Sequence, residues 1–492
     1  MDGGFERTLE RRLRTAGLIA GPGLALLVAT VNPGGHPPEG RRLLAIITLA
    51  VCFWMTEAIP LPATALLASS LAIVTGVAPA RAVLAPYADP VIFLFVGMFL
   101  LAEAFRKFGL DRELAGALLS RARFARSPAA LMAGFGAASA AVSTVLSNTA
   151  TAALMTPIAA GAAAPAAGRG AVPARWGSGV LLMVAYGASV GGMATLVGTP
   201  PNLLVAGFLE RLAGVRVSFT GWLLFGVPIA AVLLLIAWAA ASRVLAGGAG
   251  TIPAIPRREG AHDEPERAAG RRWTIAAFLL AAVLWTLPGA AALALGPGHE
   301  AAARLAGLLP EAAVALLCAS LLFLAPIHRG RRAFALTWEE GRNVNWGIIL
   351  LFGGGLSLGT LAESTGIARW AGQGIRDLPI ASTPAGLLAV TVALTILVSE
   401  FASNTAAATL LVPVAIAAAE ALGFDPVRPA LGVGLAATCG FIFPVSTPPN
   451  AIVFGTGLVP LWRMIQVGIL LDLASFLVVW LGLLLLTPLL PG

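Results

Sequence analysis

Long apolar segments are the feature that most constrains how this chain can fold. A helix needs about 20 mainly apolar residues to cross a bilayer, and several stretches of the 492-residue chain reach or approach that length. They are residues 16–31, 43–58, 61–76, 90–105, 222–242, 273–295, 345–362 and 463–488. With 58% hydrophobic and 11% charged residues, the composition excludes a water-soluble enzyme. The runs also lack the alternating strands of a transmembrane β-barrel.

Charge, cysteine and histidine content exclude further classes. The formal net charge is +8, yet the 32 basic residues form no continuous basic face, so we expect no nucleic-acid partner. Cys52, Cys318 and Cys439 lie in apolar segments at no metal-ligand spacing, and the four histidines form no cluster. We therefore expect neither a haem nor a metal centre of that kind, and no organic cofactor.

Two motifs occur twice, once on each side of a polar stretch at 245–272. Residues 143–150 (Ser-Thr-Val-Leu-Ser-Asn-Thr-Ala) match residues 399–406 (Ser-Glu-Phe-Ala-Ser-Asn-Thr-Ala) at an offset of 256. Residues 198–202 (Gly-Thr-Pro-Pro-Asn) match residues 446–450 (Ser-Thr-Pro-Pro-Asn) at an offset of 248. The matching order of elements indicates an internal repeat.

Each repeat is predicted to contain a spanning helix, a short amphipathic helix, a hairpin with a polar centre, a helix broken at its middle and a final span. In the first repeat these are 90–107, 111–123, 127–164, 176–210 and 220–243, and in the second 345–362, 366–377, 383–421, 428–458 and 463–488. The hairpins are predicted to be re-entrant, with tips inside the membrane. Non-helical backbone at that depth is tolerated only inside protein or beside a water-filled cavity, so both broken elements indicate a binding site.

The distribution of Lys and Arg predicts the topology. With a cytoplasmic N-terminus and hairpins that do not cross, 23 of the 32 basic residues lie on the cytoplasmic side, as the positive-inside rule requires. The prediction is an all-α, multi-pass protein of the cell (inner) membrane, with about 11 transmembrane helices, two re-entrant hairpins and an outside C-terminus. Its two repeats are inverted, as in many secondary transporters. A cleaved signal peptide is the alternative for the N-terminus, where we expect an uncleaved helix.

The repeated motifs suit an anion together with hard cations. Ser, Asn and Thr side chains donate and accept hydrogen bonds, and a tip between half-helices adds free N–H groups and unwound carbonyls. In the Thr-Pro-Pro-Asn motifs, proline displaces carbonyls that could hold sodium. The structural alternatives are capping and packing at the tips, and a simple proline kink with its carbonyls satisfied by Ser, Thr or water.

Charge is nearly absent from these blocks. Residues 127–168, 177–209 and 429–462 contain no ionisable side chain, and residues 383–419 contain only Glu400. If the ligand is an anion, co-bound cations must balance it, because burying an unpaired divalent anion is prohibitive. Glu400 could relay a proton or cation or brace its hairpin, and we expect bracing.

The paired motifs, with 446–455 (Ser-Thr-Pro-Pro-Asn-Ala-Ile-Val-Phe-Gly), resemble the divalent anion/sodium symporter (DASS) family of dicarboxylate, citrate and sulfate carriers over about residues 40–488. The resemblance implies a homodimer with elevator-type scaffold and transport domains. The predicted parts are 1–126 (N-terminal helix and first scaffold helices), 127–244 (first transport elements), 245–272 (cytoplasmic linker), 273–382 (scaffold helices and start of repeat 2) and 383–492 (second transport elements).

The resemblance also assigns site residues by motif position. Sodium site 1 would comprise Ser143, Ser147, Asn148 and Gly198, and sodium site 2 Ser399, Ala402, Asn404 and Ser446. Substrate would contact Ser147, Asn148, Thr149, Thr199, Pro200, Ser403, Asn404, Thr405, Thr447 and Pro448. The family more often has threonine at the position of Ser399 and a small residue such as alanine at that of Ser446.

The predicted function is secondary transport of C4-dicarboxylates such as succinate, malate or fumarate, coupled to sodium, with no enzymatic activity. The expected partners are the small anion, sodium, the lipid bilayer and a second copy of the chain. A sodium-independent exchanger, a citrate or sulfate carrier and, more remotely, an anion channel are the alternatives. An intramembrane enzyme is disfavoured, because the apolar core contains no catalytic constellation.

Overall fold

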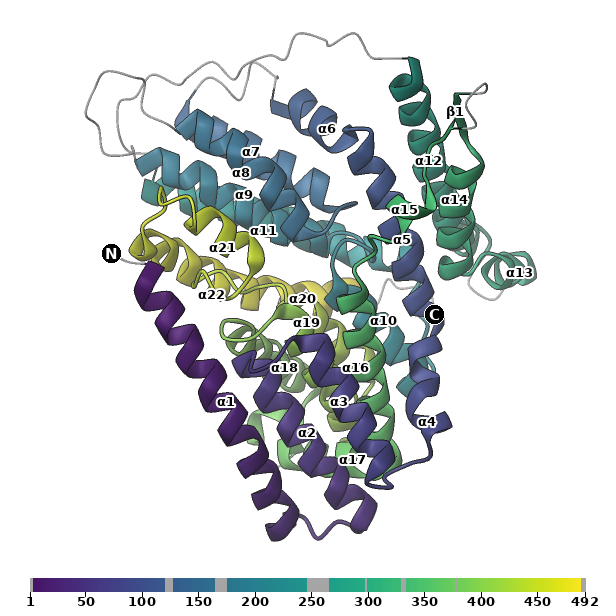
Figure 1. The fold of residues 1–492 in the computed structure, drawn as a ribbon, viewed down its shortest axis with the longest axis vertical. Coiled ribbons are helices and arrows are strands. Elements are labelled where there is room, and N and C mark those ends of the chain that lie inside the picture. The colour runs from purple at the N-terminus through teal and green to yellow at the C-terminus, as the bar shows by residue number, and fades with distance from the viewer. Residues whose placement is uncertain are drawn as a thin grey trace. The chain divides into compact units, whose positions relative to one another are not determined.

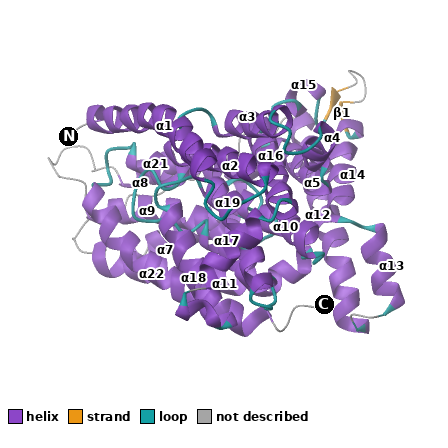
Figure 2. Ribbon diagram, turned by 90° about the horizontal axis from the view of Figure 1, so that it is seen from below, coloured by secondary structure: helices purple, strands orange, loops and turns teal. Residues whose placement is uncertain are grey.

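Helices account for nearly all of the described structure (Figures 1 and 2). A computed structural model describes residues 3–119, 127–163, 175–245, 265–296, 299–328, 333–376 and 378–487. Most of the predicted linker 245–272 lies outside these residues. One short antiparallel pair, β1 (Pro326–His328) with β2 (Ala333–Phe334), departs from the all-α prediction.

The described elements form two compact units. The first unit comprises Met1–Ile92, Leu203–Val217 and Asn345–Ala437. It contains α1 (Gly3–Val31), α2 (Pro38–Thr56), α3 (Leu61–Val74), α4 (Ala80–Leu84), η1 (Ala85–Ala88), most of α10 (Pro200–Ala213), α16 (Trp346–Ser364), α17 (Ile367–Arg376), η3 (Pro379–Ser382), α18 (Pro384–Ser399), α19 (Asn404–Ala421) and α20 (Val427–Ala436). Its core is built mainly from apolar residues of α2, α3, α16 and α17.

The second unit comprises Phe93–Asn202, Ser218–Val344 and Thr438–Gly492. It contains most of α5 (Pro90–Lys107), α6 (Leu110–Leu119), α7 (Pro128–Ser143), α8 (Asn148–Ala163), α9 (Arg175–Met193), α11 (Phe219–Leu245), α12 (Pro265–Leu295), α13 (Glu300–Leu308), α14 (Glu311–Leu324), α15 (Trp338–Gly341), α21 (Pro448–Phe454) and α22 (Leu461–Leu486), together with β1 and β2. In this unit α9 packs against α7, α8, α11 and α21.

Eight described helices are long and apolar enough to cross a bilayer, or nine if α13 and α14 form one span bent by 50°. Two predicted segments fall short for physical reasons. The helix α2 carries three charges, Glu39, Arg41 and Arg42, in its first turns, and α3 has only 14 residues. Conversely, α19 of the second hairpin passes the test, although we expected that hairpin not to cross. The count of about 11 spans therefore stays a prediction.

Each predicted repeat element has a helical counterpart, and the two hairpins begin alike. Ser127 caps α7 by accepting a hydrogen bond from Ala130 N at 3.1 Å, and Pro128 follows at the first helical position. Thr383 caps α18 in the same way: its hydroxyl accepts a hydrogen bond from Gly386 N at 3.0 Å, and Pro384 follows at the first helical position. A capping hydroxyl followed by proline fixes a helix start. Both hairpins then turn at a four-residue break, 144–147 and 400–403.

Glycines allow α9 to lie at the centre of the second unit, where every residue from Trp176 to Met193 is buried. A Cβ at Gly187 would lie 2.5 Å from Gly136 O, and one at Gly191 would lie 2.3 Å from Ala140 O. The backbones of α7 and α9 therefore touch directly, in the manner of small-residue contacts between membrane helices.

We expect Gly191→Ala to destabilise the protein, because its new methyl group would meet fixed backbone of α7. Overpacking of this kind costs about 1–3 kcal/mol, so the midpoint of thermal unfolding in detergent should fall. Gly161→Ala in α8 is the matched control, since nothing lies within 4 Å of its Cβ position. Equal midpoints for the two variants would contradict the described packing of α7 on α9.

Candidate functional site

The first hairpin tip joins α7 to α8 in the second unit and is held by its own side chains. Ser143 Oγ donates a hydrogen bond to Asn148 Oδ1 at 2.9 Å, and both residues are buried. Ser147 Oγ accepts from Ala150 N at 3.3 Å and so caps α8. The Ser143–Asn148 hydrogen bond therefore joins the end of α7 to the start of α8 and holds Ser143 Oγ beside Asn148 Oδ1.

The unwound end of α9 lies directly against this tip. A Cβ at Gly192 would fall 2.3 Å from Asn148 Oδ1, and one at Gly198 would fall 2.6 Å from Gly192 O. The hydroxyl of Thr195 also donates to Thr144 O at 2.8 Å. Three members of predicted sodium site 1, Ser143, Asn148 and Gly198, are therefore brought together around Gly192.

The asparagine of the first Thr-Pro-Pro-Asn motif holds the break between α9 and α10. Asn202 Nδ2 donates to Gly192 O at 2.9 Å and to Thr195 O at 2.8 Å. These contacts satisfy carbonyls that the interrupted helix releases. Asn202 Oδ1 is buried and has no hydrogen-bond partner among the described residues.

The second break, between α20 and α21, repeats this arrangement. Asn450 Nδ2 donates to Gly440 O at 3.1 Å and to Phe443 O at 3.0 Å, each acceptor lying 248 residues after its counterpart. Thr447 caps α21 by accepting from Asn450 N at 3.3 Å. Asn450 Oδ1 is again buried without a partner in the part of the chain that the structure describes.

The second hairpin tip belongs to the first unit. Ser399 Oγ lies 2.6 Å from Ala437 O and 3.2 Å from Asn404 Oδ1, so the tip contact of the first repeat recurs. Ala402, which has no ligating side chain, is buried beside them. Ser446, the fourth predicted member of sodium site 2, lies in the second unit and is buried, and that site stays a prediction.

The predicted substrate residues differ in exposure. Thr149 and Pro448 are exposed, and Thr199 and Thr447 are buried. Asn148 is buried as well, while the others are half-buried: Ser147, Pro200, Ser403, Asn404 and Thr405. A ligand can therefore meet the start of α8 and of α19 directly.

Two buried acidic residues lie near the interrupted helices. Glu400, at the end of α18, is 3% exposed. Asp472, in the middle of α22, is 7% exposed, and its Oδ1 accepts a hydrogen bond from Phe441 N at 3.2 Å. Asp472 is not among the site residues predicted from the sequence. The signal was present, because a lone acidic residue within a spanning helix indicates function.

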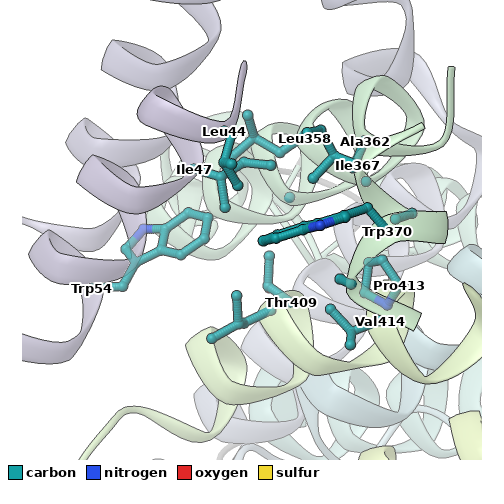
Figure 3. A pocket seen from close by; sticks show the side chains of 15 residues that line it. Leu44, Ile47, Trp54, Leu358, Ala362, Ile367, Trp370, Thr409, Pro413 and Val414 are labelled. Atoms are coloured by element: carbon teal, nitrogen blue, oxygen red, sulfur yellow. The ribbon is translucent and has the colours of Figure 1, made fainter. Parts of the chain in front are cut away.

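A cavity of about 140 Å³ in the first unit is lined by α2, α16, α17 and α19 (Figure 3). Trp54 and Trp370 face it from different helices, and Leu44, Ile47 and Leu358 complete one wall. The hydroxyl of Thr409 donates to Thr405 O within its own helix. This apolar lining offers no donor set for a carboxylate, so we do not place the anion there.

Long apolar helices, two interrupted helices and two helix-break-helix hairpins define a multi-pass membrane protein of the transporter class. The family model described as the sodium:sulfate symporter transmembrane region matches residues 19–489. The chain therefore belongs to this family of divalent anion/sodium symporters, and its relatives are named transporters rather than enzymes.

Curated relatives match over nearly the whole chain. The sodium-dependent dicarboxylate transporter SdcS of Staphylococcus saprophyticus is 30% identical over 488 residues, 96% of this chain and 91% of that protein. SdcS of Staphylococcus aureus (strain bovine RF122 / ET3-1) is 30% identical, over 94% and 89% of the two chains. The crystal structure of the Alcanivorax borkumensis YdaH transporter has the same fold, with a TM-score of 0.54 at 17% identity and coverage of 81% and 85%.

We expect Asn202→Ala and Asn450→Ala each to destabilise the protein, because each removes the side-chain donor of two carbonyls. Thr195 O and Phe443 O keep a backbone donor, from Gly198 N and Ser446 N, so the loss falls mainly on Gly192 O and Gly440 O. An acceptor left buried without a donor costs about 1–3 kcal/mol. The measurement is the thermal unfolding midpoint in detergent, with the exposed Asn343→Ala as control. Midpoints equal to that control would show that the two asparagines do not hold the breaks.

Proposed function

We propose that the protein is a secondary transporter that carries dicarboxylates across the cell membrane together with sodium ions. C4-dicarboxylates such as succinate, malate and fumarate are the expected substrates. The observation that carries the proposal is the first tip, where Ser143 and Asn148 are held against Gly192 and Gly198. This cluster supplies side-chain and backbone oxygens but no charge.

The absence of Lys and Arg bears directly on how an anion would bind. No Lys or Arg occurs in the tip or break segments, at 127–168, 177–209, 383–419 or 429–462. A bound dicarboxylate therefore needs cations beside it, since burial of an unbalanced charge is prohibitive. Sodium ions held by oxygens at the tips would provide that balance, and their binding would make uptake depend on sodium by linkage.

Sodium site 1 would use Ser143, Ser147, Asn148 and Gly198, and sodium site 2 would use Ser399, Ala402, Asn404 and Ser446. The substrate carboxylates would meet the helix starts after the two tips, where free N–H groups and the helix dipole favour an anion. The relatives named as sodium-dependent dicarboxylate transporters support this choice of ions.

The remaining parts of the proposal concern movement and assembly. The two repeats would be inverted, and a transport domain containing both hairpins and both broken helices would move as an elevator against a scaffold domain, within a homodimer. The N-terminus would be cytoplasmic and the C-terminus outside, because this orientation places most Arg residues on the cytoplasmic side.

Uptake of radiolabelled succinate into proteoliposomes tests the proposal. We expect saturable uptake that requires an inward sodium gradient. Uptake that needs only internal succinate would establish an exchanger instead, and flux without saturation would establish a channel. Competition by excess citrate or sulfate, compared with malate, tests the substrate class.

We expect Asn148→Ala and Asn404→Ala each to reduce uptake to background while the protein still inserts into the membrane, because each asparagine is shared by the predicted ion and substrate sites. The readout is initial uptake rate at equal reconstituted protein. Asn343→Ala, an exposed asparagine outside both hairpins, should retain the rate of the original protein. Unchanged uptake in either hairpin variant would remove that tip from the site.

A further inference from the structure

The second break differs from the first by one buried acidic side chain. In the first repeat, Trp222 Nε1 donates to Met193 O at 2.9 Å, and Gly226 lets α11 approach the break. In the second repeat, Gly468 has the role of Gly226, because a Cβ there would lie 2.4 Å from Phe441 O. Asp472 lies four residues, about one helical turn, after Gly468.

The corresponding position in the first repeat, four residues after Gly226, is Ala230. Both Ala230 and Asp472 are buried, at 5% and 7% exposure. Both breaks are therefore held by an asparagine amide that donates to two carbonyls, but only the second has an acidic side chain beside it. A buried carboxylate inside an apolar span is costly, and its position at a duplicated ion-binding element indicates a function beyond packing.

The contacts of Asp472 form a chain toward Asn450. Its Oδ1 accepts from Phe441 N at 3.2 Å, and this N–H shares a peptide group with the Gly440 carbonyl. Gly440 O in turn accepts from Asn450 Nδ2 at 3.1 Å. Hydrogen bonds in series polarise one another, so the carboxylate makes the amide of Asn450 more polar.

This series of hydrogen bonds ends at the Asn450 amide. Its Oδ1 is fully buried and has no partner among the described residues. The orientation of this amide is settled, because its Nδ2 faces two carbonyl oxygens. A buried oxygen without a donor is destabilising unless a ligand meets it. Amide and carbonyl oxygens are the ligands that hard cations prefer.

We propose that Asn450 Oδ1 is a sodium ligand and that Asp472 is the positioning residue that strengthens it through the Gly440–Phe441 peptide. This inference rests on the proposed sodium-coupled function and adds a ligand outside the two predicted sodium sites. It also assigns the second repeat the stronger ion-binding break, because the first break lacks the carboxylate.

Asp472→Asn tests the proposal, since it keeps an acceptor for Phe441 N–H and removes the charge. We expect the sodium concentration for half-maximal succinate uptake to rise about tenfold, the change expected when a charged acceptor becomes neutral. The maximal rate should stay within about twofold of the original. The sodium-induced rise in unfolding midpoint, measured in detergent against choline, should shift to higher sodium by the same factor.

Tyr186→Phe is the matched control. Its hydroxyl donates to Phe441 O at 3.1 Å, so the variant removes another hydrogen bond to the same segment without a change of charge. We expect its sodium dependence to match that of the original protein. If Asp472→Asn does not yield folded protein, Asp472→Gln applies the same test, because its longer side chain also carries a neutral amide oxygen as acceptor.

Each outcome separates the two proposals. Equal sodium dependence in Asp472→Asn and the original protein would overturn the role of Asp472, as would an equal rise in Asp472→Asn and Tyr186→Phe. An original protein that neither takes up succinate with sodium nor is stabilised by sodium would instead overturn the proposed function.

Discussion

The two interrupted helices depend on one constraint, which is that backbone groups released at a break must find hydrogen-bond partners away from water. Asn202 and Asn450 meet it in the same way, each through an amide nitrogen that faces two carbonyls. The amide oxygen of each then remains buried without a protein donor among the described residues. The side-chain orientation that satisfies the backbone thus also leaves the amide oxygen available, as the sodium ligand proposed above at Asn450 requires.

Glycine has an equally direct part in the geometry of the site. The close approach of α9 to the first tip leaves no room for a Cβ at Gly192, where Asn148 Oδ1 would lie 2.3 Å away. Further along the helix, Gly187 and Gly191 bring α9 onto α7. The contacts at Gly187 and Gly191 join the backbones of α9 and α7, and the contact at Gly192 places the break directly against the Asn148 side chain of the tip.

The duplicated arrangement shows which features follow from the repeat and which are particular to one half. Three features occur in both repeats. They are the asparagine that donates to two carbonyls at each break, the serine-to-asparagine contact at each tip, and the capped helix starts at Ser127 and Thr383. The acidic residues Glu400 and Asp472 occur only in the second repeat, and the corresponding residues of the first repeat are Thr144 and Ala230.

The amino-acid sequence by itself determined the membrane class, the order of the repeated helices and the position of both breaks. Apolar length, proline and the Ser-Asn-Thr motif are local signals, and local signals specify helices and their ends. Only the tertiary structure decided that Asn202 turns its nitrogen to Gly192 and Thr195, and that Asp472 reaches Phe441 from 31 residues away. These contacts depend on which helix faces pack together, and the spacing of residues along one chain does not encode that choice.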